Sequence, residues 1–350
     1  MQEKLIETLN QVGKPTEARQ SPDGSTALIL PYGGRILGLF SAASQENFFW
    51  THPALESTES ARPFFAGNQW HNSGGDRTWL APEVDFFFPD FPEVDRYWQP
   101  RELDPGHYHV VRWDGRLELV NEFAMTVSRT KQRVAMKLTK ALAPAPNPLR
   151  YEPNLKELRD IEYAGYSLHT HLELTGKCKN EGARVGLWNL LQLPHGGELW
   201  IPTYGRTEPK IIMGNVGPED LVVSDRLLRY KMCATGEHKI GIRAVATTGR
   251  VAYLHGTDSR SALIVRNFLV NPSGEYVDVP WNETSNYGFS TQACNINSKL
   301  GSFSELEYHV PAIGQGTGLY RCHDVSQVWA FRGPRDKIQH VVKTLISPEA

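Results

Sequence analysis

The sequence predicts an all-β fold of two large packed antiparallel sheets, with a short helix near each end of the chain. Many short segments alternate apolar and polar residues, and Gly, Pro, Asn and Asp separate them. Helical spacing of apolar residues is convincing only at the two ends. A series of strands without intervening helices favours a two-sheet sandwich over a small barrel. No repeat of about 20 to 50 residues is evident, which argues against a propeller or a solenoid.

Each end of the chain shows apolar residues on one helical face. Their spacing over 5–12 predicts an N-terminal helical extension within 1–20, and their spacing over 338–345 predicts a C-terminal helix over 334–347. Between these helices we expect strands over 25–31, 35–41, 107–113, 116–128, 132–140, 166–175, 184–192, 239–248, 250–255, 261–269, 286–293, 303–310 and 326–332.

The segment 143–148, Ala-Pro-Ala-Pro-Asn-Pro, is rigid and extended. Such a segment suits either a linker between domains or a long surface connection. Strand-like alternation continues unchanged on both sides of it. We therefore expect a surface connection within a single domain that covers 1–350.

Composition points to a small and largely neutral partner. The formal net charge is -2, from 37 Lys and Arg against 39 Asp and Glu, so no global field favours nucleic acid or an anionic membrane. The sequence lacks a basic start followed by an apolar run, and no stretch approaches the ~20 apolar residues of a membrane span. These features predict a soluble, cytoplasmic protein. The cysteines are far apart and without a CxxC pair, which favours reduced thiols: Cys178, Cys233, Cys294 and Cys322.

The run from Asn72 to Trp79, Asn-Ser-Gly-Gly-Asp-Arg-Thr-Trp, combines a glycine bend with groups that suit a polyhydroxylated ligand. Arg77 offers a rigid fork of donors, and Asp76 offers acceptors. Trp79 offers an apolar face on which a pyranose can stack. The alternative is a hairpin turn in which the Arg and the Asp pair at the surface.

The segment 303–311 reads as a strand in which Glu305, Glu307 and His309 share one face. Successive members of this set lie ~7 Å apart along the strand. On a concave and partly dry face, neighbouring carboxylates raise one pKa and suit it to proton transfer. On a face turned to water, the same pattern is only a solvated strand surface.

Histidines elsewhere in the sequence have both functional and structural interpretations. His169, His171 and Glu173 alternate along one strand face, where they form either a set of metal ligands or the polar side of a half-exposed strand; we favour the latter, and likewise for His107 and His109. Trp188 lies on a β-like run that ends in a Pro/Gly turn at His195, where an imidazole suits a general acid. An inactive turn histidine is the alternative.

The acidic stretch 83–90 contains oxygen ligands that suit calcium. Phenylalanines are interleaved with these acidic residues, however. This pattern is more typical of a buried loop anchor.

Taken in order, several of these segments resemble the galactose mutarotase-like, or aldose 1-epimerase-like, family. The resemblance rests on three segments: a strand with a Gly-Gly turn over 28–36, the Gly-Gly-Asp-Arg loop over 74–77, and Leu306-Glu307 a few residues before Pro311. The resemblance spans roughly 25–332 and implies a large antiparallel β supersandwich. It implies that a sugar or glycoside binds, without a cofactor or a metal.

The resemblance also implies roles for individual residues. It makes Glu307 the base that removes the proton of the anomeric hydroxyl, and it makes Arg77 a sugar-binding residue. Asn72, Asp76, Trp79, Glu305 and Trp188 are the further candidates for substrate binding. The Asn-His of the family has no clear counterpart, since 188–190 reads Trp-Asn-Leu. His195 and His309 are therefore the candidates for the acid.

Two other functions remain open at this point. In the first, the protein lacks the acid of the Asn-His pair and is a non-catalytic carbohydrate-binding or sensing protein that kept its cleft. On the same scaffold, a glycosidase or lyase would need a second carboxyl group across the cleft from Glu307, and Glu305 and Glu83 are the pairs to examine.

Overall fold

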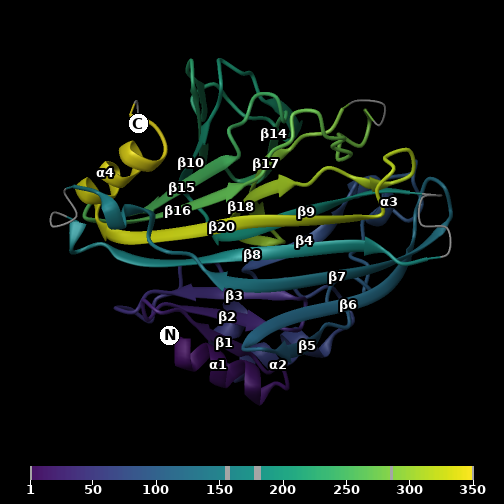
Figure 1. The fold of residues 1–350 in the computed structure, drawn as a ribbon, viewed down its shortest axis with the longest axis horizontal. Helices are drawn as coiled ribbons and strands as arrows, with labels where there is room; N and C mark the ends of the chain where they lie inside the picture. The colour runs from purple at the N-terminus through teal and green to yellow at the C-terminus, as the bar shows by residue number, and fades with distance from the viewer. Residues whose placement is uncertain (1, 154–157, 177–182, 284–286, 349–350) are drawn as a thin grey trace.

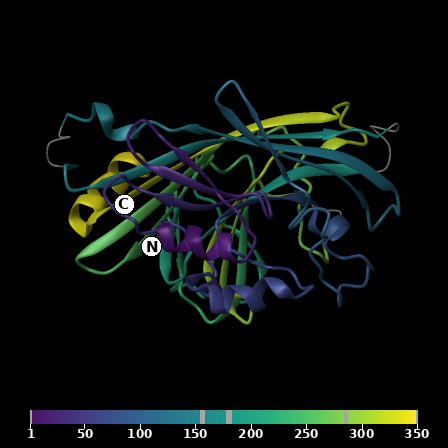
Figure 2. The same cartoon turned by 90° about the horizontal axis from the view of Figure 1, so that it is seen from below.

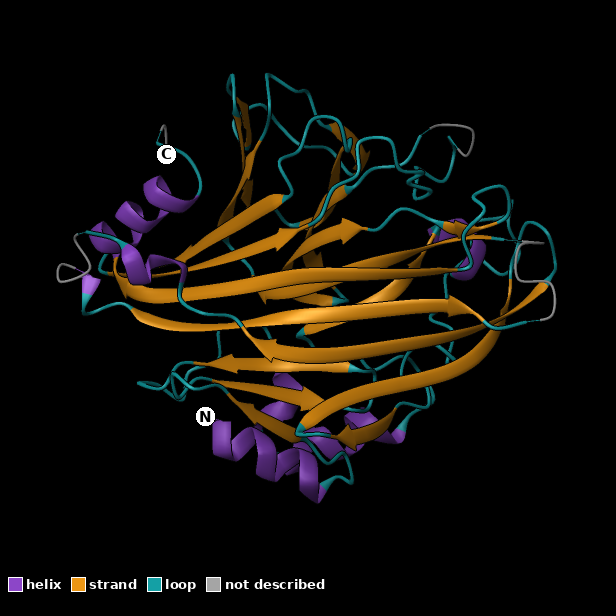
Figure 3. Ribbon diagram, in the orientation of Figure 1, coloured by secondary structure: helices purple, strands orange, loops and turns teal. Residues whose placement is uncertain are grey.

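The computed structural model describes residues 2–153, 158–176, 183–283 and 287–348, and its described part is dominated by β-strands (Figure 3). The strands form two ten-stranded sheets in which the pairings are antiparallel (Figure 1). In the view from below, the long teal and yellow strands run together in one curved layer (Figure 2). This architecture confirms the predicted all-β fold of two large antiparallel sheets with short terminal helices.

The first sheet has the order β1 (Glu17–Gln20), β2 (Thr26–Leu30), β3 (Arg35–Phe40), β4 (Asp76–Ala81), β9 (Arg184–Pro194), β18 (Gly301–His309), β17 (Thr291–Ser298), β14 (Gly236–Ile242) and β11 (Lys210–Met213), with β19 (Ile313–Gly314) paired to β9. The second sheet has the order β12 (Leu221–Val223), β13 (Leu227–Met232), β10 (Gly197–Pro202), β15 (Arg250–Gly256), β16 (Arg260–Phe268), β20 (Arg321–Pro334), β8 (Glu162–Leu174), β7 (Arg133–Pro144), β6 (Arg116–Thr126) and β5 (His109–Trp113). The helices are α1 (Gln2–Gln11), α2 (Thr58–Ala66), α3 (Glu83–Phe86) and α4 (Arg335–Leu345), with 3-10 turns at Pro53–Glu56 and Pro148–Tyr151.

Each strand expected from the sequence has a counterpart, but three local expectations need correction. The helical extension expected within 1–20 ends at Gln11, and Glu17–Gln20 form β1. Asp76 and Arg77, expected in the loop 74–77, are the first residues of strand β4. All six residues of β4 are buried, so both faces are covered and the polar/apolar alternation that reveals a half-exposed strand is missing. The strands β10, β11, β12, β13 and β19 were also not expected.

The main core lies between the two sheets and is lined by the inward-facing residues of both. Leu191 and Leu306 of the first sheet belong to the same buried cluster as Leu168 and Val328 of the second. Burying apolar surface at about 25 cal/mol per Å² makes this contact the principal stabilising term of the fold. On the outside of the second sheet, α4 buries its apolar face against Phe331 and neighbouring side chains. None of the helices in the described ranges is both long and apolar enough to cross a membrane.

A buried ion pair joins the two sheets inside this core. Arg266 of β16 places Nη1 3.1 Å from Oδ1 of Asp76 and Nη2 3.2 Å from Oδ2, and the Tyr166 hydroxyl donates to Oδ2 at 2.7 Å. Both charged side chains are fully buried. Asp76 therefore faces the second sheet, and its neighbour Arg77 faces the other way, because successive side chains of a strand point to opposite faces.

We expect Asp76→Asn to lower the free energy of unfolding by about 3–5 kcal/mol, because it leaves the Arg266 guanidinium buried without a counter-charge. The measurement is urea unfolding followed by circular dichroism. The control is Asp90→Asn, which breaks an exposed ion pair with Arg96 and should cost less than about 1 kcal/mol. Equal losses in the two variants would contradict a central role for the buried pair.

Candidate active site

A cavity of about 650 Å³ lies over the face of the first sheet that is turned away from the second sheet. Directly paired residues of antiparallel strands point to the same side of a sheet, so paired residues of neighbouring strands together form the floor of the cavity. Leu190 pairs with both Arg77 and Glu307, and Cys294 pairs with both Glu305 and Lys239. The residues that line it are Trp70, Arg77, Trp79, Glu83, Pro92, Val94, Tyr97, Gln99, Trp188, Leu190, Ile212, Met213, Glu237, Lys239, Trp281, Asn282, Cys294, Ile296, Leu300, Phe303, Glu305 and Glu307.

Glu307 is held on one side of its carboxyl group only. Its Oε2 accepts a hydrogen bond from Trp188 Nε1 at 2.8 Å and lies 3.0 Å from Lys239 Nζ. Its Oε1 is buried and has no partner among the described residues. Burial raises the pKa of Glu307 to about 7, with Lys239 opposing and Glu305 adding to the rise. The carboxyl group is thus divided between its two protonation states near neutral pH, with one oxygen free for a ligand.

Lys239 supplies the positive charge beside Glu307. Burial alone would lower the pKa of Lys239, but the carboxylates of Glu307, Glu83 and Asp278 outweigh it and the pKa is raised. The ammonium group also lies 4.5 Å from the centroid of the Trp188 ring. Lys239 is therefore a permanent cation at this site and a poor proton donor.

Arg77 is fixed between a carboxylate and two indole rings. Its Nη2 lies 2.9 Å from Glu305 Oε1, which also accepts from Gln192 Nε2 at 3.0 Å. Its guanidinium carbon lies 4.2 Å from the centroid of Trp79 and 5.5 Å from that of Trp70. The Nε and Nη1 atoms are buried without partners in the described part of the chain, so they remain as donors for a ligand.

Asp104 orients the two indole rings that enclose Arg77. Its Oδ2 accepts from Trp70 Nε1 and from Trp79 Nε1, each at 3.0 Å, and it also accepts from Arg35 Nη2 at 2.7 Å. Three donors on one oxygen leave each ring little freedom to rotate. Asp104 thus positions this wall of the pocket without lining it.

Glu83, at the start of α3, lines the same pocket and is held by two aromatic side chains. Tyr97 Oη donates to its Oε1 at 2.9 Å, and Trp281 Nε1 donates to its Oε2 at 2.8 Å. Burial raises the pKa of Glu83, and the neighbouring Asp278 raises it further against the opposing effect of Lys239. This second carboxyl group therefore has a larger protonated fraction than an ordinary glutamate.

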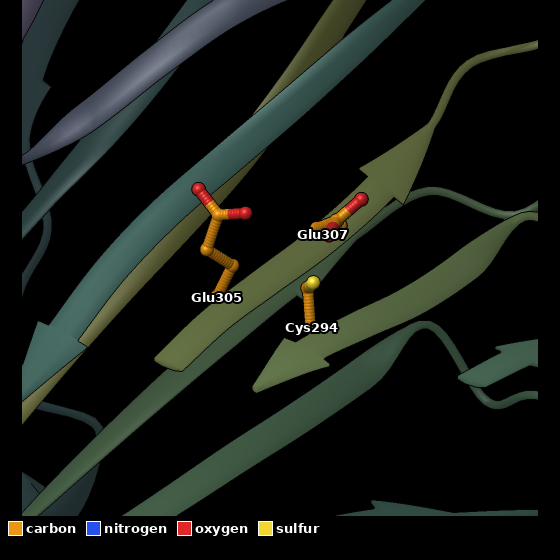
Figure 4. A group of neighbouring side chains, drawn as sticks. All are labelled: Cys294, Glu305 and Glu307. Atoms are coloured by element: carbon orange, nitrogen blue, oxygen red, sulfur yellow. The ribbon is translucent and has the colours of Figure 1, made fainter. Parts of the chain in front are cut away.

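Cys294, Glu305 and Glu307 lie close enough to be considered as metal ligands, as Figure 4 shows. Their sulfur and oxygen atoms lie within 4.8 Å of one another. Each carboxylate already has a cation, however: Arg77 at Glu305 and Lys239 at Glu307. A divalent ion would add positive charge to a site in which each carboxylate already has a counter-charge, so these contacts do not favour a metal here.

Five of the site residues predicted from the sequence line the pocket together, and four others do not line it. Arg77, Trp79, Trp188, Glu305 and Glu307 line the pocket. The four that do not line it are Asp76, Asn72, His195 and His309. Asp76 forms the core ion pair, because it is adjacent to Arg77 on a strand and so faces the opposite side. Asn72 is buried outside the lining.

The two histidines predicted as acid candidates have other surroundings. His195 lies after the end of β9, and its Nε2 is 3.0 Å from Asn295 Oδ1. His309 stacks on Trp188 with ring centroids 5.6 Å apart, and its Nε2 lies 3.8 Å from Asp278 Oδ2. Burial lowers the pKa of His309 to about 4, which leaves the imidazole neutral.

Other sequence alternatives are also decided by burial. His169, His171 and Glu173 are half-exposed and alternate with buried residues along β8, as expected for the polar side of a strand. The phenylalanines at 86–88 are buried, which confirms a loop anchor. Among the described cysteines, Cys233, Cys294 and Cys322 are free thiols, as expected, and Cys178 lies outside the described residues.

Sequence reasoning missed Lys239, Trp70, Tyr97 and Trp281, and it considered Glu83 only as a calcium ligand or as a partner for Glu307. A lone lysine in a strand ordinarily indicates a solvent-exposed side. Only the pairing of β14 with β17, and of β17 with β18, shows that Lys239 faces Glu307. Tyr97 and Trp281 come from connections 184 residues apart in number, and no local pattern links them.

The pKa of Glu307 is the most direct measurable property of this site. We expect carbon-13 NMR of labelled glutamate side chains to show one carboxyl group titrating near pH 7. In Lys239→Met that pKa should rise, because the cation that favours the carboxylate is gone. Glu307→Gln identifies the signal by removing it. If the Glu307 signal titrated at the ordinary glutamate pKa of about 4.3, the described environment of Glu307 would be contradicted.

Comparison with known proteins places the chain in a family but not yet in a function. No curated protein matches it. A galactose 1-epimerase from Lactobacillus acidophilus NCFM aligns over 90% of this chain and 93% of its own, with a TM-score of 0.41 and 6% identity. An α-galactosidase from Lactobacillus brevis aligns over 95% of this chain and 41% of its own, with a TM-score of 0.30 and 10% identity. Both scores are low, so the function must be argued from the pocket itself. The model of a family of unknown function, DUF6786, matches residues 5–348, and the chain belongs to this family.

Proposed function

We propose that this protein is a carbohydrate-active enzyme of the aldose 1-epimerase type, which transfers protons at the anomeric centre of a sugar. The observation that carries the proposal is the Glu307 carboxyl group, with one buried oxygen free of partners in an aromatic pocket. A base works best when its pKa lies near the working pH, and the pKa of Glu307 is raised to about 7.

The lining of the pocket supports a sugar as the ligand. Trp79 and Trp188 offer aromatic surface to the apolar face of a pyranose ring. Arg77 and Glu305 offer donors and acceptors to its hydroxyl groups. A few fixed polar groups in a mainly aromatic cavity are the usual composition of a small-molecule site.

In the proposed reaction, Glu307 removes the proton from the anomeric hydroxyl group while an acid protonates the ring oxygen. The bond between the anomeric carbon and the ring oxygen then breaks, and an open-chain aldehyde forms. After rotation about the adjacent carbon–carbon bond, the ring oxygen attacks the other face of the aldehyde and both protons return. Lys239 keeps Glu307 oriented through this exchange, and the groups of the chain suffice without a cofactor.

Glu83 is the better candidate for the acid than either histidine. It lines the pocket with Glu307, whereas His195 and His309 do not. The raised pKa of Glu83 favours the protonated form that an acid requires. A pair of carboxyl groups in one pocket also supports a second candidate function, the hydrolysis of a glycoside. Proton NMR separates the two functions, because hydrolysis releases a free sugar from a glycoside whereas anomerisation only exchanges the two anomers of a free sugar.

We expect Glu307→Gln to lower turnover by about 100-fold or more, because proton transfer by a positioned base typically contributes 10²–10⁴-fold. The amide oxygen can still accept from Trp188, and Glu83 and Asp278 remain as counter-charges near Lys239, so the melting temperature should fall less than in Asp76→Asn. Anomer exchange by proton NMR over a panel of aldoses is the assay, and the exposed Glu122→Gln is the control. A large loss of stability with full activity per folded molecule would defeat the proposal. Binding without acceleration would favour a sugar-sensing protein.

The two carboxyl groups should act on opposite limbs of the pH profile. Wild-type kcat/KM should rise with pH through about 7, since only ionised Glu307 accepts a proton. Ionisation of Glu83 should act in the opposite direction and lower kcat/KM, since only the protonated form can donate a proton. Glu83→Gln should remove most of the activity across the range, whereas His309→Gln should keep the profile of the wild type. If His309→Gln removed most of the activity and Glu83→Gln kept the profile of the wild type, the acid role would belong to His309 instead.

A further inference from the structure

The mouth of the pocket carries two large aromatic rings that the fold leaves open to solvent. Tyr97 is 39% exposed and Trp281 is 36% exposed, although both line the cavity. Their ring centroids lie 6.5 Å apart with an interplanar angle of 29°. We call this pair the aromatic rim. Large exposed rings at a pocket mouth are typical of surfaces that bind a ligand.

The rim is held rigidly although it comes from two separate connections. The Tyr97 hydroxyl group and Trp281 Nε1 both donate to the same carboxyl group, that of Glu83. Behind them, Phe88 contacts Trp281 edge to face with the ring centroids 4.6 Å apart. Phe87 stacks on Tyr97 with the ring centroids 5.8 Å apart. Because the rings are already fixed, a ligand that stacks on them loses little binding energy to ordering them.

The cavity is larger than one sugar ring requires. Its volume of about 650 Å³ lies in the middle of the range of about 300–1,000 Å³ that holds drug-sized ligands. The inner part, around Trp79, Trp188, Arg77 and Glu307, contains the polar groups that a reacting ring needs. The outer part, at the rim, offers mainly aromatic surface.

The charges of the pocket favour a neutral ligand. Among the described lining residues the cations are Arg77 and Lys239, and each already pairs with a carboxylate. Glu83 and Glu237 add further acidic groups to the wall. A phosphate or a uronate would therefore meet no unmatched positive charge and would lie close to carboxylates.

We propose that the pocket binds a neutral reducing saccharide of two or more rings, with the reducing-end ring in the inner part and the next ring stacked on the aromatic rim. The inference rests on the proposed function, and it adds an outer binding site to it. Glu83, the proposed acid, also positions the rim through the two hydrogen bonds that it accepts.

The test is isothermal titration calorimetry with neutral reducing saccharides of one, two and three rings, built from glucose, galactose or mannose. For the sugar series that binds, the second ring should lower Kd about tenfold or more. Trp281→Ala should raise the Kd of the two-ring ligand about tenfold and change that of the single ring less than twofold. Trp281→Phe, which keeps a stacking ring, should recover most of the loss.

The control is Trp113→Ala, which removes an exposed ring from β5, at the edge of the second sheet, and should change neither Kd. Equal affinity for one and two rings would overturn the outer site. So would an equal effect of Trp281→Ala on both ligands, or tighter binding of a sugar phosphate than of its neutral parent. If a single ring is turned over without preference for length, only this inference fails. If no saccharide of the panel binds, the proposed function fails with it.

Discussion

The buried ion pair between Asp76 and Arg266 is the interaction on which the geometry of the pocket depends. It joins the first sheet to the second and fixes which residues of β4 face the core. Because side chains alternate along a strand, the same contact directs Arg77 and Trp79 to the opposite face. A shift of β4 by one residue would place an arginine in the core and an aspartate in the pocket. One core contact thus specifies a wall of the site.

The charge pairs of the core and of the pocket both leave buried polar atoms without partners among the described residues. In the core, Asp76 has three hydrogen bonds from two side chains. In the pocket, Glu307 Oε1 and Arg77 Nε and Nη1 have no partners among the described residues, and in the core the same holds for Arg266 Nε. Buried polar groups without partners are costly to the folded protein. The pocket atoms lie beside an open cavity, which is consistent with the proposal that a ligand completes them.

The sequence was sufficient for the fold class and for part of the site, and the limits have physical causes. The alternation of 303–309 indicated that Glu305 and Glu307 share a face, which the pairing of β18 confirms. The run 76–79 was treated as one cluster because a loop was expected; as a strand, it divides its residues between two faces. Lys239 and the aromatic rim depend on contacts between distant segments, and a single sequence carries no local signal for such contacts.

The concentration of indole rings in the pocket has a practical consequence. Four of the nine tryptophans, Trp70, Trp79, Trp188 and Trp281, line the cavity. All four donate through Nε1 to a carboxyl group of the site or of its surroundings. Indole emission responds to the polarity and charge of its surroundings. The protein therefore carries an intrinsic fluorescence reporter of pocket occupancy, and unlabelled ligand libraries can be screened against it in solution.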